Sequence, residues 1–228
     1  NPRDLGAIKA MGVAVTLIEA GGREKHPNLV SPAASATQFH TKLDWDFAPE
    51  PEPHCHNRSL YIPRGKGLGG SSNMNAMLYV RGRPLDYDMW ERDHGAAGWG
   101  WNDVLPFFRK LERDLDFGGE QHGQDGPVPI RRTKPDDWAP LSKAVHVYAQ
   151  ERQIPFIADM NTDFRDGYGA VPMSNWPEKR ASAAICYLDP TVRARPNLTI
   201  INHATVTGMS FEGKRATGIV WRGETGEG

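Results

Sequence analysis

The residues best suited to bind a ligand are the glycines and serines between Gly65 and Ser72. This stretch reads Gly65-Lys66-Gly67-Leu68-Gly69-Gly70-Ser71-Ser72. Glycine lets backbone N–H groups approach a ligand closely, and serines at the start of a helix favour an anion or the polar edge of a ring. The pattern predicts a loop on which a cofactor could lie. Taken alone, it is equally compatible with a turn made only for helix–sheet packing.

Two common phosphate-binding motifs do not fit this loop. The spacing of Gly65, Gly67 and Gly70 matches G-x-G-x-x-G, but that fingerprint needs a buried strand before it and a strand with an acidic residue about 20 residues later. Pro63 interrupts the preceding segment, and helices are expected after the loop. Because Lys66 is followed by Gly67 rather than Ser or Thr, the loop is not a P-loop either.

A second candidate is Glu19, which follows the apolar run Val13–Ile18. The run predicts a strand buried on both faces of a parallel sheet. A carboxylate at the end of such a strand can accept hydrogen bonds from both hydroxyls of an adenosine ribose. Its phosphate-binding glycine loop would lie about 20 to 25 residues earlier, before Asn1. The alternative is a surface glutamate that merely ends a strand.

Other reactive side chains give weaker evidence for a functional site. In an extended chain, His54 and His56 face opposite to Cys55, and no fourth ligand is in view, so an exposed loop is expected and no metal site. His122 is expected to be a turn and packing residue in the loop Gly118–Gly126. Trp99 and Trp101 are expected to be core anchors rather than a sugar platform.

The elements around these residues follow from periodicity and turn signals. Helices are expected to end at Gly12, to run over Asn73–Val80 and Pro84–Asp93, to be capped by Asn102, and to bury Leu141, Ala144, Val145 and Tyr148. Strands are expected at Val128–Arg131, Leu198–His203, Thr205–Phe211 and Arg215–Arg222. The helix before Gly12 is the tail Leu5–Met11. This order predicts an α/β nucleotide-binding domain interrupted by part of a second domain.

Composition excludes several classes of protein. The 228 residues include 24 glycines and 18 prolines, which rules out a helix bundle or coiled coil. A formal charge of -1 gives no global field for nucleic acid or anionic lipid, and no run approaches the roughly 18 apolar residues of a membrane helix. Two cysteines without C-x-x-C, and an N-terminus without signal-peptide features, predict a cytoplasmic location.

The loop and its flanks resemble a known family. Gly65–Asn75, with Tyr79, Gly82 and Asp88, resembles the first signature of the glucose–methanol–choline (GMC) oxidoreductases. The resemblance extends over nearly the whole chain, through Leu17–Gly22, Gly98–Trp101, Asp103–Phe108, His122–Pro127, Ser182–Ala184 and Arg195–Thr199. In detail, it looks most like the N-terminal portion of bacterial choline dehydrogenase-like and hydroxymethylfurfural oxidase-like members.

The resemblance implies an FAD site. It suggests a ribose-binding acid, a loop that passes over the FAD, a stretch that touches the isoalloxazine, and a residue whose backbone meets the adenine. The cofactor-binding residues so implied are Glu19, Ala20, Gly65, Gly69, Gly70, Ser71, Asn75, Ala76, Met77, Leu78 and Val206. Some members attach FAD covalently through a histidine, whose position here is Asn73, so FAD is expected to be non-covalent.

The resemblance also implies a reaction. Family members oxidise an alcohol by hydride transfer to flavin, with oxygen or a quinone-type compound as the electron acceptor, and no nucleic-acid partner is expected. Their catalytic histidine and its His or Asn partner lie near the far C-terminus, so no catalytic residue is assigned here. Whether this chain alone binds FAD is left open. Two alternatives remain, an FAD-containing hydroxynitrile lyase of the same fold and a truncated chain with no activity of its own.

The expected fold class is therefore mixed α/β, an incomplete Rossmann-like FAD-binding domain interrupted by part of a substrate-binding domain. Residues 1–126 are expected to form part of the FAD-binding domain with its flavin-covering loop. Residues 127–185 would belong to the substrate-binding domain, and 186–228 would return to the FAD-binding domain as a β-meander.

Overall fold

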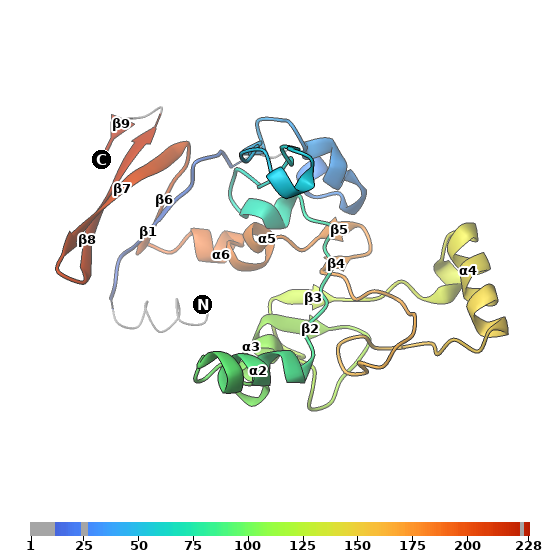
Figure 1. The fold of residues 1–228 in the computed structure, drawn as a ribbon. Coiled ribbons are helices and arrows are strands. Elements are labelled where there is room, and N and C mark those ends of the chain that lie inside the picture. The colour runs from blue at the N-terminus through green and yellow to red at the C-terminus, as the bar shows by residue number, and fades with distance from the viewer. Residues whose placement is uncertain (1–11, 24–26, 224–225) are drawn as a thin grey trace. The chain divides into compact units, whose positions relative to one another are not determined.

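The computed structural model describes residues 12–23, 27–223 and 226–228, and the chain divides into two compact units (Figure 1). One unit contains Asn1–Ala76 and Ser182–Gly228, and the other contains Met77–Ala181. The expected helical tail Leu5–Met11 lies outside the described residues. This division differs from the expected boundaries at residues 126 and 185, and the assignment of those three segments to domains stays a prediction.

The first unit is built on a parallel pair of strands from distant parts of the chain. Strand β1 (Val15–Ile18) pairs with β6 (Leu198–Ile201), with Val15 opposite Leu198 (Figure 1). The parallel arrangement predicted for β1 is confirmed. Burial on both faces is not seen, because Thr16 is exposed and the pair has no third strand in the described residues. The sheet is therefore only half-buried within this unit.

An antiparallel meander follows the parallel pair. Its strands are β7 (Ala204–Glu212), β8 (Arg215–Gly223) and β9 (Gly226–Glu227). The turn between β7 and β8 places Gly213 at φ +59°, a left-handed conformation that glycine adopts without steric cost. The predicted tight turn and both long strands are confirmed.

Short helical turns fill the rest of the first unit. They are the 3-10 helices η1 (Pro27–Leu29), η2 (Pro32–Gln38), η3 (Pro53–Cys55) and η4 (Gly70–Asn73), and the α-helices α5 (Ala183–Tyr187) and α6 (Pro190–Arg193). The helix predicted over Asn73–Val80 is wrong. The helical turn there is η4, which ends at Asn73. Met77 has φ +61°, which a right-handed helix does not allow.

The second unit begins with two aromatic-rich helices. They are α2 (Pro84–His94), which ends at Gly95 with φ +68°, and α3 (Trp101–Leu111). Tyr87 packs against Trp101 and Phe108 at ring-centroid distances of 5.7 and 5.8 Å. The predicted helix Pro84–Asp93 is confirmed. The predicted cap at Asn102 is wrong, because the helix begins one residue earlier and Gly100 is its N-cap.

Short strands and one longer helix complete the second unit. The remaining elements are β2 (Glu112–Asp114), β3 (Val128–Ile130), η5 (Pro135–Asp137), α4 (Pro140–Glu151), β4 (Asn175–Trp176) and β5 (Lys179–Arg180). β2 and β3 pair in parallel, and β4 and β5 form an antiparallel hairpin. Helix α4 forms as predicted, but the expected burial of Leu141, Ala144, Val145 and Tyr148 is not seen, because all four are exposed within the described residues and only Ala149 of the helix is buried. Across the described residues, no helix is long and apolar enough to span a bilayer.

The loop 118–126 provides a test of the packing in the second unit. A Cβ added to Gly126 would collide with the backbone of Glu112, whereas the nearest atom to a Cβ on Gly118 is the Gln124 amide nitrogen at 4.0 Å. We predict that Gly126→Ala lowers the free energy of unfolding by roughly 1–3 kcal/mol through overpacking. Gly118→Ala is the matched control. Equal unfolding midpoints for the two variants in urea would contradict the packing described here.

Candidate cofactor-binding site

Glu19 is held at the carboxyl end of β1 by both its backbone and its side chain. Its N–H donates to the Ile201 carbonyl (2.9 Å), and its carbonyl accepts from the Ala204 N–H (3.0 Å). The side-chain Oε1 accepts from the N–H groups of Gly21 (2.8 Å) and Gly67 (2.9 Å). Oε2 receives no hydrogen bond from the described residues. One carboxylate oxygen therefore binds the glycine loop, and the other is available to a ligand hydroxyl.

The glycine loop packs closely on the turn after β1. A Cβ on Gly21 would lie 2.6 Å from the Gly67 nitrogen, and the Leu68 N–H donates to the Gly22 carbonyl (3.3 Å). Gly65 also requires the absence of a side chain, because a Cβ there would collide with the backbone of Gly70. The packing explanation therefore holds for Gly21 and Gly65.

Packing does not explain the glycine at residue 70. Gly70 has φ +52°, and no atom lies within 4 Å of a Cβ built on it. The backbone of Gly70 is therefore open to a close approach from outside. Ser71 closes the loop, since its Oγ accepts from the Gly65 N–H (3.1 Å). The loop combines an internally bonded frame with an accessible glycine.

A cavity of about 170 Å³ lies beside the loop, within the first unit. Gly67, Gly70 and Lys66 line it, together with Arg23 and Arg193. Burial and the nearby charge of Arg23 lower the pKa of Arg193, against the opposing effect of Asp189. None of the residues that line the cavity is acidic. A region with an excess of positive charge suits an anionic group such as a phosphate.

The cavity wall also carries an unsatisfied polar atom. Ser182 is 1% exposed, and its Oγ has no hydrogen-bond partner among the described residues. Buried polar groups of this kind are usually satisfied by a partner, a water or a ligand. This atom, and Glu19 Oε2, which receives no hydrogen bond from the described residues, offer hydrogen-bonding capacity that the polar part of a dinucleotide could use.

The remaining implied cofactor residues are spread over both units. Ala20 is half-buried next to Glu19, and Asn75 and Ala76 are exposed after η4. Val206 is 44% exposed on β7, two residues after Ala204, whose N–H bonds to Glu19. The structure thus brings Glu19, the loop residues Gly65–Ser71 and the start of β7 together. Met77 and Leu78 begin the second unit.

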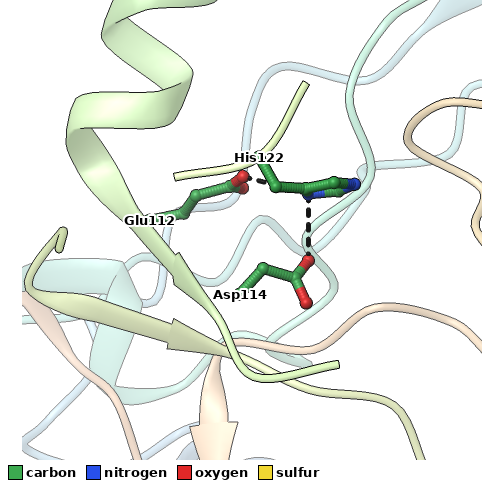
Figure 2. Close-up of side chains that lie close together, drawn as sticks. All are labelled: Glu112, Asp114 and His122. Atoms are coloured by element: carbon green, nitrogen blue, oxygen red, sulfur yellow. Dashed lines mark hydrogen bonds and ion pairs between the residues drawn. The ribbon is translucent and has the colours of Figure 1, made fainter. Parts of the chain in front are cut away.

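A buried ion cluster in the second unit was not anticipated from the sequence. Its centre is His122, which is 3% exposed. Nδ1 lies 3.2 Å from Glu112 Oε1 and 3.1 Å from Asp114 Oδ2 (Figure 2). Nε2 lies 2.8 Å from Asp159 Oδ2. His122 is a buried packing residue, as expected, but its contacts are ion pairs with carboxylates.

Two arginines complete this cluster. Arg81 pairs with Glu112, and Arg132 makes 2.8 Å bonds to Asp114 and Asp159. With His122 protonated, three carboxylates face three cations. The members of the ion cluster are Arg81, Glu112, Asp114, His122, Arg132 and Asp159. They are separated by up to 78 residues in sequence, so no local spacing could have revealed them.

The protonation of His122 decides what the cluster can do. Burial alone would lower the pKa of His122, but hydrogen bonds to Asp114, Asp159 and Glu112 outweigh burial and raise it to about 11. At Asp114, hydrogen bonds from His122, Arg132 and two backbone N–H groups outweigh burial and lower the pKa of its carboxyl to about 2. Glu112, Asp114 and His122 lie close enough to hold a metal ion. With its imidazole protonated, His122 acts as a cation, and the cluster is a network of buried ion pairs.

The parallel β1–β6 pair, the acid at its end and the glycine loop bonded to that acid define a dinucleotide-binding protein. The comparison with known families is more specific. The GMC oxidoreductase family matches residues 9–227, and the chain belongs to that family. It is a choline dehydrogenase-like FAD oxidoreductase sequence, and its fold is an incomplete Rossmann-like FAD-binding domain, as the resemblance implied.

The similarity to individual relatives extends over most of this chain, but this chain spans less than half of the length of each relative. Oxygen-dependent choline dehydrogenase from Ectopseudomonas mendocina is 40% identical over 91% of this chain, which spans 37% of that protein. Pyridoxine 4-oxidase from Mesorbium loti superposes with a TM-score of 0.87 at 31% identity, over 94% of this chain and 42% of its own. An FAD-dependent oxidoreductase from Chaetomium thermophilum superposes with a TM-score of 0.81 at 28% identity, over 94% and 38%.

The ion cluster predicts a pH-dependent stability. Because folding raises the pKa of His122 from 6.5 to about 11, its contribution is complete below pH 6.5 and is lost as the pH rises toward 11. Because folding lowers the pKa of Asp114 from 3.8 to about 2, its contribution is present above pH 3.8 and is lost as the pH falls toward 2. Urea unfolding measured from pH 2 to pH 11 should show the greatest free energy of unfolding between pH 3.8 and pH 6.5.

Removing the imidazole tests the same network. At pH 7, His122→Gln should lower the free energy of unfolding by about 3–5 kcal/mol, because it leaves three buried carboxylates facing only two cations, Arg81 and Arg132. The variant should also lose much of the decline between pH 6.5 and 11. His40→Gln is the matched control, because the His40–Asp46 pair is more than half exposed and contributes about 0–1 kcal/mol. If both variants unfold alike, the cluster is not the network described.

Proposed function

We propose that the protein containing this chain oxidises a primary alcohol to an aldehyde, using non-covalently bound FAD. The observation that carries the proposal is that the two oxygens of the Glu19 carboxylate differ. Oε1 accepts hydrogen bonds from Gly21 and Gly67, and Oε2 receives none from the described residues and is available to a ligand hydroxyl. In a GMC oxidoreductase, that oxygen would accept from the adenosine ribose. Glycines at 65, 69 and 70 with Ser71 would pass over the FAD, and Asn75–Leu78 would meet its isoalloxazine.

The structure around Asn73 supports non-covalent attachment. Asn73 is 8% exposed, and its amide donates to the Leu68 carbonyl (2.7 Å). An amide offers no nucleophile for a covalent flavin bond, and this one is committed to shaping the glycine loop. We therefore assign Asn73 a structural role and propose that FAD is held by polar contacts alone.

The chemistry follows from what the cofactor and the alcohol exchange. When bound, FAD accepts the hydride from the alcohol carbon. The hydroxyl proton leaves to a base, which we place outside these 228 residues. The chain's own part is to hold the ribose through Glu19 and the anionic portion beside Lys66 and Arg193.

The substrate class is supported by the names of two relatives. Choline and pyridoxine, the compounds in the names of the choline dehydrogenase and the pyridoxine 4-oxidase, both carry a primary hydroxyl group. We propose oxygen or a quinone-type compound as the electron acceptor. We also propose a cytoplasmic location, since Cys55 and Cys186 form no disulfide with each other.

The proposal is tested with the purified full-length protein. It should carry oxidised flavin, and a primary alcohol added without oxygen should bleach the flavin bands as aldehyde forms. A colourless protein that takes up no FAD would overturn the proposal. Cyanide release from a cyanohydrin, with no bleaching by any alcohol, would instead identify a hydroxynitrile lyase.

The role of Glu19 predicts a loss of FAD affinity in Glu19→Gln. The amide can keep the Oε1 bonds to Gly21 and Gly67, but its NH₂ group cannot accept a ribose hydroxyl. A hydrogen bond to a charged group contributes about 1.5–3 kcal/mol, so the dissociation constant should rise about 10- to 100-fold. Fluorescence titration of the apoprotein with FAD measures this. Glu50→Gln, an exposed glutamate of the same unit, is the control, and equal affinities for the two variants would exclude the role given to Glu19.

A further inference from the structure

The segment 77–81 of the second unit has an unusual backbone. Met77 has φ +61° and is 3% exposed. A non-glycine residue adopts this left-handed conformation only where its surroundings hold it there, and such residues gather at functional sites. The family resemblance gives Met77 and Leu78 a place beside the isoalloxazine. Contacts that hold this segment are therefore candidates for a role in the reaction.

One side of the segment is held by the chain at 172–174. Ser174 donates twice to the Met77 carbonyl, from its N–H at 2.8 Å and from its Oγ at 3.2 Å. Leu78 forms a bridge with Met173, and the Tyr79 N–H donates to the Pro172 carbonyl (2.9 Å). These bonds fix the turn at Met77 and start an extended backbone after it.

The other side is held by a single buried side chain, Asn161. Its Oδ1 accepts from the Arg81 N–H (2.9 Å), and its Nδ2 donates to the Tyr79 carbonyl (3.0 Å). Asn161 is 0% exposed. One amide group thus pairs with the two backbone groups on either side of Val80, as a neighbouring β-strand would. The planar amide of asparagine carries a donor and an acceptor on separate atoms, which this pairing uses.

The pairing is continuous with the ion cluster. The Asn161 N–H donates to Asp159 Oδ1 (3.2 Å), and Asp159 binds His122 and Arg132. Arg81, the last residue of the segment, binds Glu112 of the same cluster. The segment is therefore connected to the buried ion cluster through both Asn161 and Arg81.

The result is a defined apolar edge. Leu78 is 61% exposed and Val80 is 56% exposed, whereas Met77 is buried and Tyr79 is half-buried. In an extended backbone, residues two apart face the same side, so the side chains of Leu78 and Val80 share a face. Exposed apolar side chains on so firmly held a segment fit the planar ring of a flavin.

We propose that Asn161 and Ser174 are positioning residues, which hold segment 77–81 so that Leu78 meets the isoalloxazine in a fixed geometry. The inference rests on the proposed function. Neither side chain touches the cofactor in this account; each acts through the backbone that it binds. Loosening the segment should therefore change the environment of the flavin and the rate of hydride transfer more than it changes substrate binding.

The test uses Asn161→Ala and Ser174→Ala in the full-length, FAD-loaded protein. Ser174→Ala is the milder change, since the backbone bond to Met77 remains, and it decides the question if Asn161→Ala does not fold. Because small misplacements of reacting groups cost up to about 100-fold in rate, kcat should fall about 10- to 100-fold in Asn161→Ala and less in Ser174→Ala. KM should stay nearly constant, and the visible flavin spectrum should shift in both.

The matched control is Asn175→Ala. Asn175 is 5% exposed, and its amide donates to the Trp176 carbonyl (2.8 Å), so it is a buried asparagine whose side chain does not bind segment 77–81. It should lower stability without shifting the flavin spectrum. If the wild type carries flavin but both test variants have the same flavin spectrum and kcat as Asn175→Ala, the positioning role is wrong and the proposed function still stands. A wild type that binds no FAD would overturn the proposed function and, with it, this one.

Discussion

The first unit depends on the hydrogen bonds that converge on one oxygen of Glu19. Oε1 accepts from Gly21 on its own turn and from Gly67 on a loop 48 residues away in sequence. Hydrogen bonds to an ionised carboxylate are stronger than neutral ones, so this pair joins the end of β1 to the glycine loop. The close approach requires glycine at residue 21. The proposed ligand-binding geometry and the local fold therefore depend on the same hydrogen bonds.

The second unit depends on charge balance rather than on a large apolar core. Its most buried side chains include the polar or charged residues Glu112, Arg180 and Asn161 as well as the apolar Ile130. Buried charges are costly unless they are paired, so removing one member of the ion cluster leaves an excess of the opposite charge. In return it gives a rigid support, and the backbone of segment 77–81 is bonded to that support through Asn161 and Arg81.

Local patterns in the sequence predicted many elements but few contacts. Strands β1, β7 and β8 and helices α2 and α4 follow from β-branched runs and helical spacing, which act over a few residues. The helix expected over Asn73–Val80 failed because the conformation of Met77 depends on Ser174, almost a hundred residues later. The ion cluster is invisible to such patterns for the same reason. The flavin-contacting residues came from the family resemblance, and their roles remain predictions.

A crystal structure of the full-length protein with FAD would test the account most directly. It should show an adenosine ribose hydroxyl within hydrogen-bond distance of Glu19 Oε2, while Oε1 keeps its bonds to Gly21 and Gly67. The ring of the flavin should lie against Leu78. A ribose bound elsewhere, or a Glu19 carboxylate released from the glycine loop, would contradict the account.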